Sequence, residues 1–341
     1  MAIGDRDRAE AKPRPRRRLI ATISALATLG VVLTLAVTAQ GYQSQEVPRL
    51  ESSVWVMRDS GQYARVNTEL AEIDTVRNVD DPEAVWQSGS TAVLYAQGNR
   101  QRWDVDAASP ADLLSDSSEE GTPLASQPTP AGTREILSAG PYVAYRTDTG
   151  QVSVSTLAPG AGNALVDPFA EVEVEEGEDP PTYTADAIGL SPEGLLVLYS
   201  ADEEAVRRFD IDEHRFLGDS TSVPEAPEAG EGLALTVIGD RWAMLRSGSG
   251  ELWLSGRDQP VELDMAEDAR LQGGAASGDV VMVADSDGLV SVELASGESE
   301  RVAEATGVPA APVTVRGKTY AAWLDTGGGT LWTDGETVPL R

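Results

Sequence analysis

Residues 280–293 read VVMVADSDGLVSVE, and this stretch contains the local pattern from which the fold can be inferred. Four apolar residues, Val280-Val-Met-Val283, are followed by the turn Asp285-Ser-Asp-Gly288 and by the alternating segment Leu289-Val-Ser-Val-Glu293. A short continuous apolar run is typical of a strand buried on both faces, whereas period-two alternation indicates a half-buried strand. Gly and Asp supply the positive φ angles that tight hairpins need. The stretch therefore predicts a β-hairpin with one deeply buried strand.

The same unit recurs along the chain. Its apolar runs start 50, 54, 46, 38 and 40 residues apart. Because propeller blades repeat about every 40–50 residues, we expect six clear units and one partial unit. The sequence thus predicts an all-β, β-propeller-like domain of six to seven blades over residues 53–341. The apolar runs are Ala92-Val-Leu-Tyr95, Tyr142-Val-Ala-Tyr145, Leu196-Val-Leu-Tyr199, Trp242-Ala-Met-Leu245, Val280-Val-Met-Val283 and Tyr320-Ala-Ala-Trp323.

The two ends of the repeat region resemble each other. Within each repeat we call the alternating strand that follows the buried strand the partner strand. The pattern of Ser53-Val-Trp-Val-Met57 predicts a partner strand that lacks its buried strand, and the pattern of Thr330-Leu-Trp-Thr333 is similar. Propellers often close by completing one blade from both termini, and these two segments look like the same part of a blade. Three stretches rich in Ser, Pro and acidic residues, 107–133, 158–182 and 219–232, are expected to be solvated loops.

An uncharged run lies near the start of the chain, from Leu19 to Ala39. Twenty-one residues at a helical rise of about 1.5 Å span roughly 31 Å, which matches the hydrocarbon core of a bilayer. The basic segment Lys12–Arg18 precedes the run, and the positive-inside rule then places the N-terminus in the cytoplasm. The alternative is a cleaved signal peptide ending at Val37-Thr38-Ala39, although the run is longer than most signal-peptide cores.

This topology divides the chain into four parts and locates it at the plasma membrane as a single-pass protein with its main domain extracellular. The parts are a basic cytoplasmic tail (1–18), a transmembrane helix (19–39), a linker (40–52) and the propeller-like extracytoplasmic domain (53–341).

The charge balance excludes several partners. The net charge is −30, and the part that follows Arg18 carries 53 acidic and 19 basic residues. So acidic a domain repels phosphate backbones, which argues against nucleic-acid binding. Because the chain has no cysteine, thiol catalysis and Cys-based metal sites are excluded.

No catalytic or cofactor-binding constellation emerges from the sequence. The one histidine, His214, is expected in an exposed hairpin turn without a nucleophile motif. Asp285-Ser-Asp-Gly288 and Asp202-Glu-Glu204 are the best calcium-like fragments, but turn chemistry explains the first equally well. Lys12 and Lys318 are the only lysines, and no phosphate-binding loop is present. We therefore assign no catalytic, cofactor-binding or metal-binding residues.

Tryptophans recur at similar places in the repeat. They could form a platform on which sugars stack, but aromatic spacing in a repeat more often serves blade packing. We favour packing for Trp55, Trp103, Trp253 and Trp332.

Several framework segments together resemble a known family. They are Glu46-Val-Pro-Arg-Leu-Glu-Ser-Ser-Val-Trp-Val56, Gln62-Tyr-Ala-Arg-Val-Asn67, Ile73-Asp-Thr-Val76, Trp86-Gln-Ser-Gly-Ser-Thr91, Asn99-Arg-Gln-Arg-Trp103 and Ser109-Pro-Ala-Asp112. The chain resembles the N-terminal, membrane-anchored region of large fibronectin type III or Ig-like surface proteins of high-GC Gram-positive bacteria. The resemblance implies an anchor and a propeller-like region, and it implies cell-surface adhesion or scaffolding; the β-sandwich modules of that family do not occur in this chain.

Two functions follow as alternatives. The first is a non-enzymatic binding or scaffold domain at the cell surface, with a surface protein or cell-wall polymer as its partner. The second is an extracytoplasmic carbohydrate-active enzyme, a glycoside hydrolase, that uses paired carboxylates and Trp residues. A narrow or plugged channel would favour the first.

Overall fold

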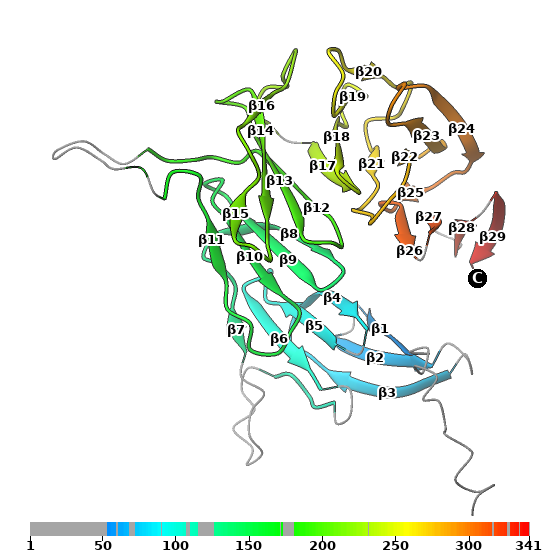
Figure 1. Ribbon diagram of the computed structural model, residues 1–341. Coiled ribbons are helices and arrows are strands. Elements are labelled where there is room, and N and C mark those ends of the chain that lie inside the picture. The colour runs from blue at the N-terminus through cyan, green and yellow to red at the C-terminus, as the bar shows by residue number, and fades with distance from the viewer. Residues whose placement is uncertain are drawn as a thin grey trace, which may run out of the picture. The chain divides into compact units, whose positions relative to one another are not determined.

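Seven antiparallel sheets follow one another along the chain, and each forms one blade of a β-propeller (Figure 1). We describe the fold from a computed structural model, which covers residues 53–58, 61–67, 72–89, 91–106, 110–114, 126–170, 172, 181–230, 232–315, 317–325, 328–333 and 335–340. The all-β propeller prediction is confirmed, and the number of blades is seven. The predicted tail, membrane helix and linker, residues 1–52, lie outside the described residues. Within the described part, we find no helix with the length and apolar character needed to cross a membrane.

The strands of the blades have the following bounds. Blade 1 contains β1 (Ser53–Arg58), β2 (Gln62–Asn67) and β3 (Glu72–Asn78); blade 2 contains β4 (Pro82–Ser88), β5 (Thr91–Ala96), β6 (Gln101–Val105) and β7 (Gln127–Pro128); blade 3 contains β8 (Thr133–Ala139), β9 (Tyr142–Thr147), β10 (Val152–Thr156) and β11 (Ala164–Val166). Blade 4 contains β12 (Ala187–Leu190), β13 (Leu195–Ser200), β14 (Ala205–Asp210), β15 (Arg215–Phe216) and β16 (Thr221–Ser222); blade 5 contains β17 (Leu233–Ile238), β18 (Arg241–Arg246), β19 (Glu251–Leu254) and β20 (Val261–Glu262). Blade 6 contains β21 (Arg270–Leu271), β22 (Val280–Asp285), β23 (Gly288–Glu293) and β24 (Ser299–Glu304); blade 7 contains β25 (Val308–Pro309), β26 (Val313–Val315), β27 (Lys318–Asp325), β28 (Gly328–Thr333) and β29 (Glu336–Leu340).

Each of blades 2 to 7 begins with a strand at the inner edge, where neighbouring blades meet. The first strand β12, for example, contacts β9 of the blade before it and β17 of the blade after it. The second strand of the blade is paired on both sides and is covered on both faces, which explains its unbroken apolar run. In β18, Ala243, Met244 and Leu245 are fully buried. The apolar runs that are visible in the sequence are therefore second strands, and the inner first strands were missed.

A recurring hydrogen bond fixes the identity of the strands in blade 1. In blades 2, 4, 5 and 6, the residue that follows the outer strand donates its N–H to a carbonyl in the turn between the second and third strands, as from Leu263 to Gly250 at 2.9 Å. In blade 3 the corresponding carbonyl, of Gly150, accepts the N–H of Ala185 instead. In blade 1 the same bond runs from Val79, after β3, to Gly61, between β1 and β2, at 3.0 Å. The strands β1, β2 and β3 thus correspond to second, third and fourth strands. Among the described residues, blade 1 has no first strand.

This assignment corrects two expectations about the chain ends. The segment from Ser53 to Met57 is a second strand rather than a partner strand, and the strand absent beside it is the first. The two segments are not the same part of a blade, because β1 is a second strand whereas β28 is the third strand of blade 7, which β29 completes. The sequence could not distinguish a second strand from a third strand at this position, because strands of both kinds contain apolar residues.

The three stretches predicted as loops contain short outer strands. They include β7, β11 and β16, which pair with the third strands of blades 2, 3 and 4. The loop before β7 also places Leu113 in a bridge beside Val79, where it is 1% exposed. Outer strands of two or three residues carry too few apolar residues to stand out from a polar loop.

Six buried clusters hold the blades together, and each cluster joins two consecutive blades. The cluster around Trp55 and Leu94 joins blades 1 and 2, and the cluster around Ala284 and Trp323 joins blades 6 and 7. The other four clusters join blades 2 and 3, 3 and 4, 4 and 5, and 5 and 6. Among the described residues, no such cluster joins blade 7 to blade 1. We call this position the open interface.

Polar side chains add to the contacts between blades. Arg102 in β6 is 2% exposed, and its guanidinium donates to the carbonyls of Thr156 at 2.9 Å and Ala158 at 3.1 Å in blade 3. Trp323 Nε1 donates to the Asp285 carbonyl at 2.7 Å and connects blade 7 to blade 6. Buried donors need such partners, since an unpaired one costs about 1–3 kcal/mol.

Candidate binding site: an arginine-lined hollow on blades 3 to 5

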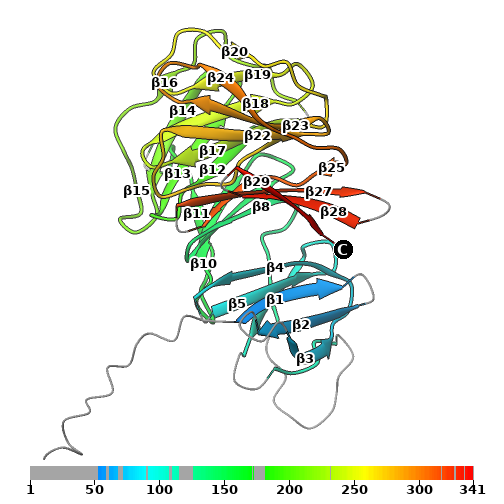
Figure 2. The ribbon, with the colours of Figure 1, turned by 90° about the vertical axis from the view of Figure 1, so that its right-hand side faces the viewer.

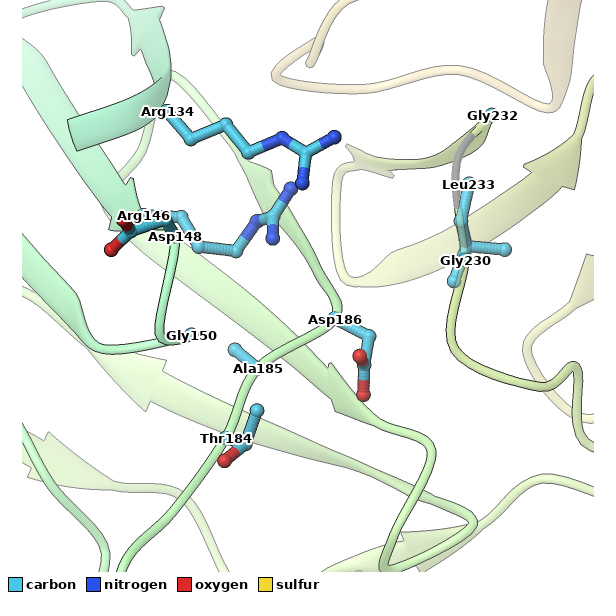
Figure 3. A pocket seen from close by; sticks show the side chains of 10 residues that line it. All are labelled: Arg134, Arg146, Asp148, Gly150, Thr184, Ala185, Asp186, Gly230, Gly232 and Leu233. Atoms are coloured by element: carbon cyan, nitrogen blue, oxygen red, sulfur yellow. The ribbon is translucent and has the colours of Figure 1, made fainter. Parts of the chain in front are cut away.

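A hollow of about 270 Å³ lies where segments of three blades meet. Blade 3 contributes two arginines and the turn after β9, and the segments leading into β12 and β17 complete the wall (Figure 3). The lining residues are Arg134, Arg146, Asp148, Gly150, Thr184, Ala185, Asp186, Gly230, Gly232 and Leu233. We call it the arginine hollow.

A β-bulge brings its two arginines together. The register between β8 and β9 shifts between Thr133 and Glu135, so Arg134 is the extra residue in its strand. A bulge redirects the side chain of the inserted residue. The guanidinium groups of Arg134 and Arg146 consequently lie side by side and extend into the same space (Figure 3).

The carboxylates around the hollow are held by other groups. Arg146 Nε donates to Glu135 Oε2 at 2.8 Å. Asp186 Oδ2 accepts the N–H of Ala201 at 2.8 Å. The carboxylate of Asp148 points away from the hollow in Figure 3. The end of the Arg146 guanidinium beyond Nε is therefore turned toward the open space.

Gly150 allows the close approach of the chain that forms the floor. Its φ is +78°, and a Cβ at this position would lie 2.5 Å from Thr184 Cγ2 and 3.0 Å from the Ala185 nitrogen. Any other residue would push the β9–β10 turn away from the segment leading into β12. The glycine thus determines the depth of the hollow.

The arrangement is suited to binding an anion. Two adjacent guanidinium groups present several N–H donors in fixed planes, which match the geometry of a carboxylate or phosphate. The two carboxylates among the lining residues, Asp148 and Asp186, are turned away or bound as described above, and no histidine accompanies the arginines there. Three larger hollows, of about 610, 570 and 360 Å³, lie near Glu304, Glu298 and Tyr183, but none of them brings together basic side chains from several blades.

The centre of the propeller is closely packed between blades 4 and 6. Gly274 lies so near Leu190 that a Cβ on the glycine would be 1.8 Å from the Leu190 carbonyl oxygen. Two backbones therefore touch with no side chain between them.

The tryptophans noted in the sequence are packing residues. Trp55, Trp253 and Trp332 are 4%, 4% and 7% exposed and belong to clusters between blades, and Trp103 packs against the first of these clusters. Trp103, Trp253 and Trp332 occupy third strands as expected, but Trp55 lies in the second-type strand β1. Buried rings offer no surface on which a sugar could stack.

The other singled-out residues are turn residues. His214 is exposed at a φ of +49° between β14 and β15. Asp285 is fully buried, and its carboxylate accepts N–H groups from Ala266 and Asp287 at 3.0 Å each and from Arg301 at 3.4 Å. A cation at Asp285 would have to displace these donors. Glu203 pairs with Arg207 at 2.9 Å, and no group of three His, Asp or Glu with metal-site geometry occurs among the described residues.

The arginine hollow was missed by sequence reasoning. Arg134 and Arg146 lie 12 residues apart, without a motif, and they meet only because one strand contains a bulge. A bulge leaves no mark in the apolar pattern.

Comparisons with known proteins support the fold and go no further. No family model matches the chain, and no curated protein matches it. Among solved structures, the β-propeller domain of Cps50 (Swd1) from Myceliophteria thermophila aligns with a TM-score of 0.51 at 12% identity, over 82% of this chain and 92% of that one. Hsv2 from Kluyveromyces lactis aligns with a TM-score of 0.50 at 8% identity, over 85% and 94% of the two chains. At such identity the likeness is one of fold alone.

Proposed function

We propose that this protein is a non-enzymatic binding scaffold, anchored in the plasma membrane by Leu19–Ala39, that displays its propeller at the cell surface. Its partner is a surface protein that presents an anionic group to the arginine hollow. The observation that supports this most is the convergence of Arg134 and Arg146 on one hollow in a chain with a net charge of −30. Because the rest of so acidic a molecule repels anions, two adjacent cationic groups form a site at which an anion can bind selectively.

Three further features favour binding over catalysis. The backbones of blades 4 and 6 meet at Gly274 and Leu190, which leaves no room between these two segments for the carboxylate pair of a glycosidase. The tryptophans that could have stacked on sugars are used in packing. The hollow itself is dominated by two arginines, and its carboxylate Asp186 is already bound to the N–H of Ala201.

The test uses the full chain in detergent micelles on an array of synthetic peptides with Glu- and Asp-containing sequences, together with cell-wall fragments. Each acidic peptide is paired with its Gln or Asn counterpart. We expect saturable binding of acidic peptides and weaker binding of the neutral ones. The double variant Arg134→Gln/Arg146→Gln should lower the affinity by about tenfold or more, because charge-assisted bonds are lost.

The matched control removes two positive charges elsewhere, by Arg215→Gln and Arg270→Gln on exposed positions. It should leave the affinity within about twofold, since distant surface charges are screened. Equal losses in both double variants would refute the hollow as the site. Selective binding of a cell-wall fragment would show that the partner is a polymer rather than a protein. Release of a cleaved glycan would show that the protein is an enzyme rather than a scaffold.

A further inference from the structure

The open interface differs from every other contact between blades. Blades 1 and 7 each take part in one buried cluster, whereas blades 2 to 6 each take part in two. Both views place the last blade, in red, next to the first blades, in blue and cyan (Figure 1 and Figure 2). In the part of the chain that the structure describes, these two neighbouring blades thus lack the buried apolar cluster that joins the others.

Apolar side chains remain exposed on both of these blades. Ten large hydrophobic residues are exposed among the described residues, and seven of them lie on blades 1 and 7. This distribution indicates that apolar surface is left uncovered where the ring ends. The seven are Val54, Ile73, Val76, Val308, Val313, Leu324 and Val338.

Among the described residues, an inner strand edge is also unpaired here. β1 is a second-type strand at the edge of its sheet, and no described strand pairs with its inner edge. The Trp55 N–H points to this edge and donates to the side-chain oxygen of Gln87 in β4 at 3.1 Å. Because N–H groups alternate along a strand, Met57 presents its N–H to the same edge. Backbone groups that a first strand satisfies in the other six blades are therefore available to another strand.

We propose that the open interface accepts an extended strand of a partner protein, which pairs with β1 as the missing first strand of blade 1. The strand carries apolar residues at alternate positions to cover Val54 and the facing surface of blade 7, and basic residues flank it because the propeller is strongly acidic. This proposal is independent of the arginine hollow, which lies on blades 3 to 5.

The probe is a synthetic peptide with the sequence of the first strand β17, Leu233–Ile238, and two added arginines at each end. The control peptide has the same side chains but is N-methylated at alternate backbone nitrogens, so it partitions into micelles equally but cannot form a ladder. Backbone amide exchange is followed in the full chain in micelles. We expect the probe, and not the control, to slow exchange of the Trp55 and Met57 amides by at least about tenfold at saturation.

A variant tests the direction of the effect. Gln87→Met removes the side-chain oxygen that occupies the Trp55 N–H, and it should tighten probe binding by about two- to tenfold. Gln151→Met, on an exposed turn of blade 3, is the control and should change nothing. Equal protection by both peptides, or none by either, would overturn the proposal. Slow amide exchange of β1 without any peptide would also overturn the proposal. If this protection does not depend on protein concentration, the strand beside β1 belongs to this same chain; if it rises with concentration, the strand belongs to a second copy.

Discussion

Tyr142 connects blades 3 and 4 through a single hydrogen bond, which its hydroxyl donates to Asp212 Oδ2 at 2.7 Å. The bond to this carboxylate, together with burial, raises the pKa of Tyr142 to about 12. A tyrosine whose pKa is higher in the folded than in the unfolded chain stabilises the fold below its unfolded pKa of about 10. That stabilisation is lost as the pH rises through about 12.

We expect Tyr142→Phe to lower the free energy of unfolding by about 1 kcal/mol at pH 8, since one hydrogen bond is lost. The difference from the wild type should shrink between about pH 10 and 12, because the wild type alone loses this bond there. Urea denaturation at a series of pH values measures both. Asp212→Asn keeps an acceptor but removes the charge, so it should remain near the wild type at pH 8 with a weaker alkaline decline. A constant difference from pH 8 to 12 would contradict the role of this pair.

Single residues also explain why the candidate site could not be predicted. Turn residues such as His214 and the Asp285–Gly288 group were recognised because Asp, Gly and His have local backbone preferences that the sequence displays. Arg134 has no such local signature. Its position depends on the pairing of β8 with β9, which is set by the whole blade.

At the scale of elements, the second strands were predictable because burial on both faces requires a continuous apolar run. First strands such as β8, Thr133–Ala139, face neighbouring blades and the propeller centre, so they mix polar and apolar residues and gave no clear period. The partial unit was recognised at the correct place. The predicted type of its first strand was wrong. The sequence around Trp55 resembles that of the third strands that contain tryptophan, and only the pairing of β1 with β2 shows that it is a second strand.

A substitution in the inner segment between β21 and β22 tests how closely the backbones of blades 4 and 6 are packed. Gly274→Ala would put a methyl group 1.8 Å from the Leu190 carbonyl oxygen, so the backbones of two blades must separate. We expect a loss of at least about 2 kcal/mol in unfolding free energy. Gly248→Ala, in a turn of blade 5 with no atom within 4 Å of the added group, is the matched control and should cost less than about 1 kcal/mol. Equal stability of the two variants in guanidinium titrations would mean that the centre is not closely packed.

For the whole molecule, the sequence alone predicts how the chain is held at the cell. If Leu19–Ala39 is an anchor, the protein stays in the membrane fraction after carbonate washing, and its intact mass includes residues 1–39. Proteases added to intact cells should then degrade the propeller but spare the basic tail. Recovery of a soluble exported product that begins near Gln40 would instead identify a cleaved signal peptide.

The six core clusters stand in a row, and this order decides how local damage affects the assembly of blades. In a closed ring, the loss of one interface leaves every blade connected to the rest by the other route. Among the residues described here there is one apolar route only, so loss of the cluster around Ile188 would divide the molecule into an arc of three blades and an arc of four. Loss of a terminal cluster would detach a single blade. A strand bound in the open interface would add the second route, and with it a redundancy that no individual contact provides.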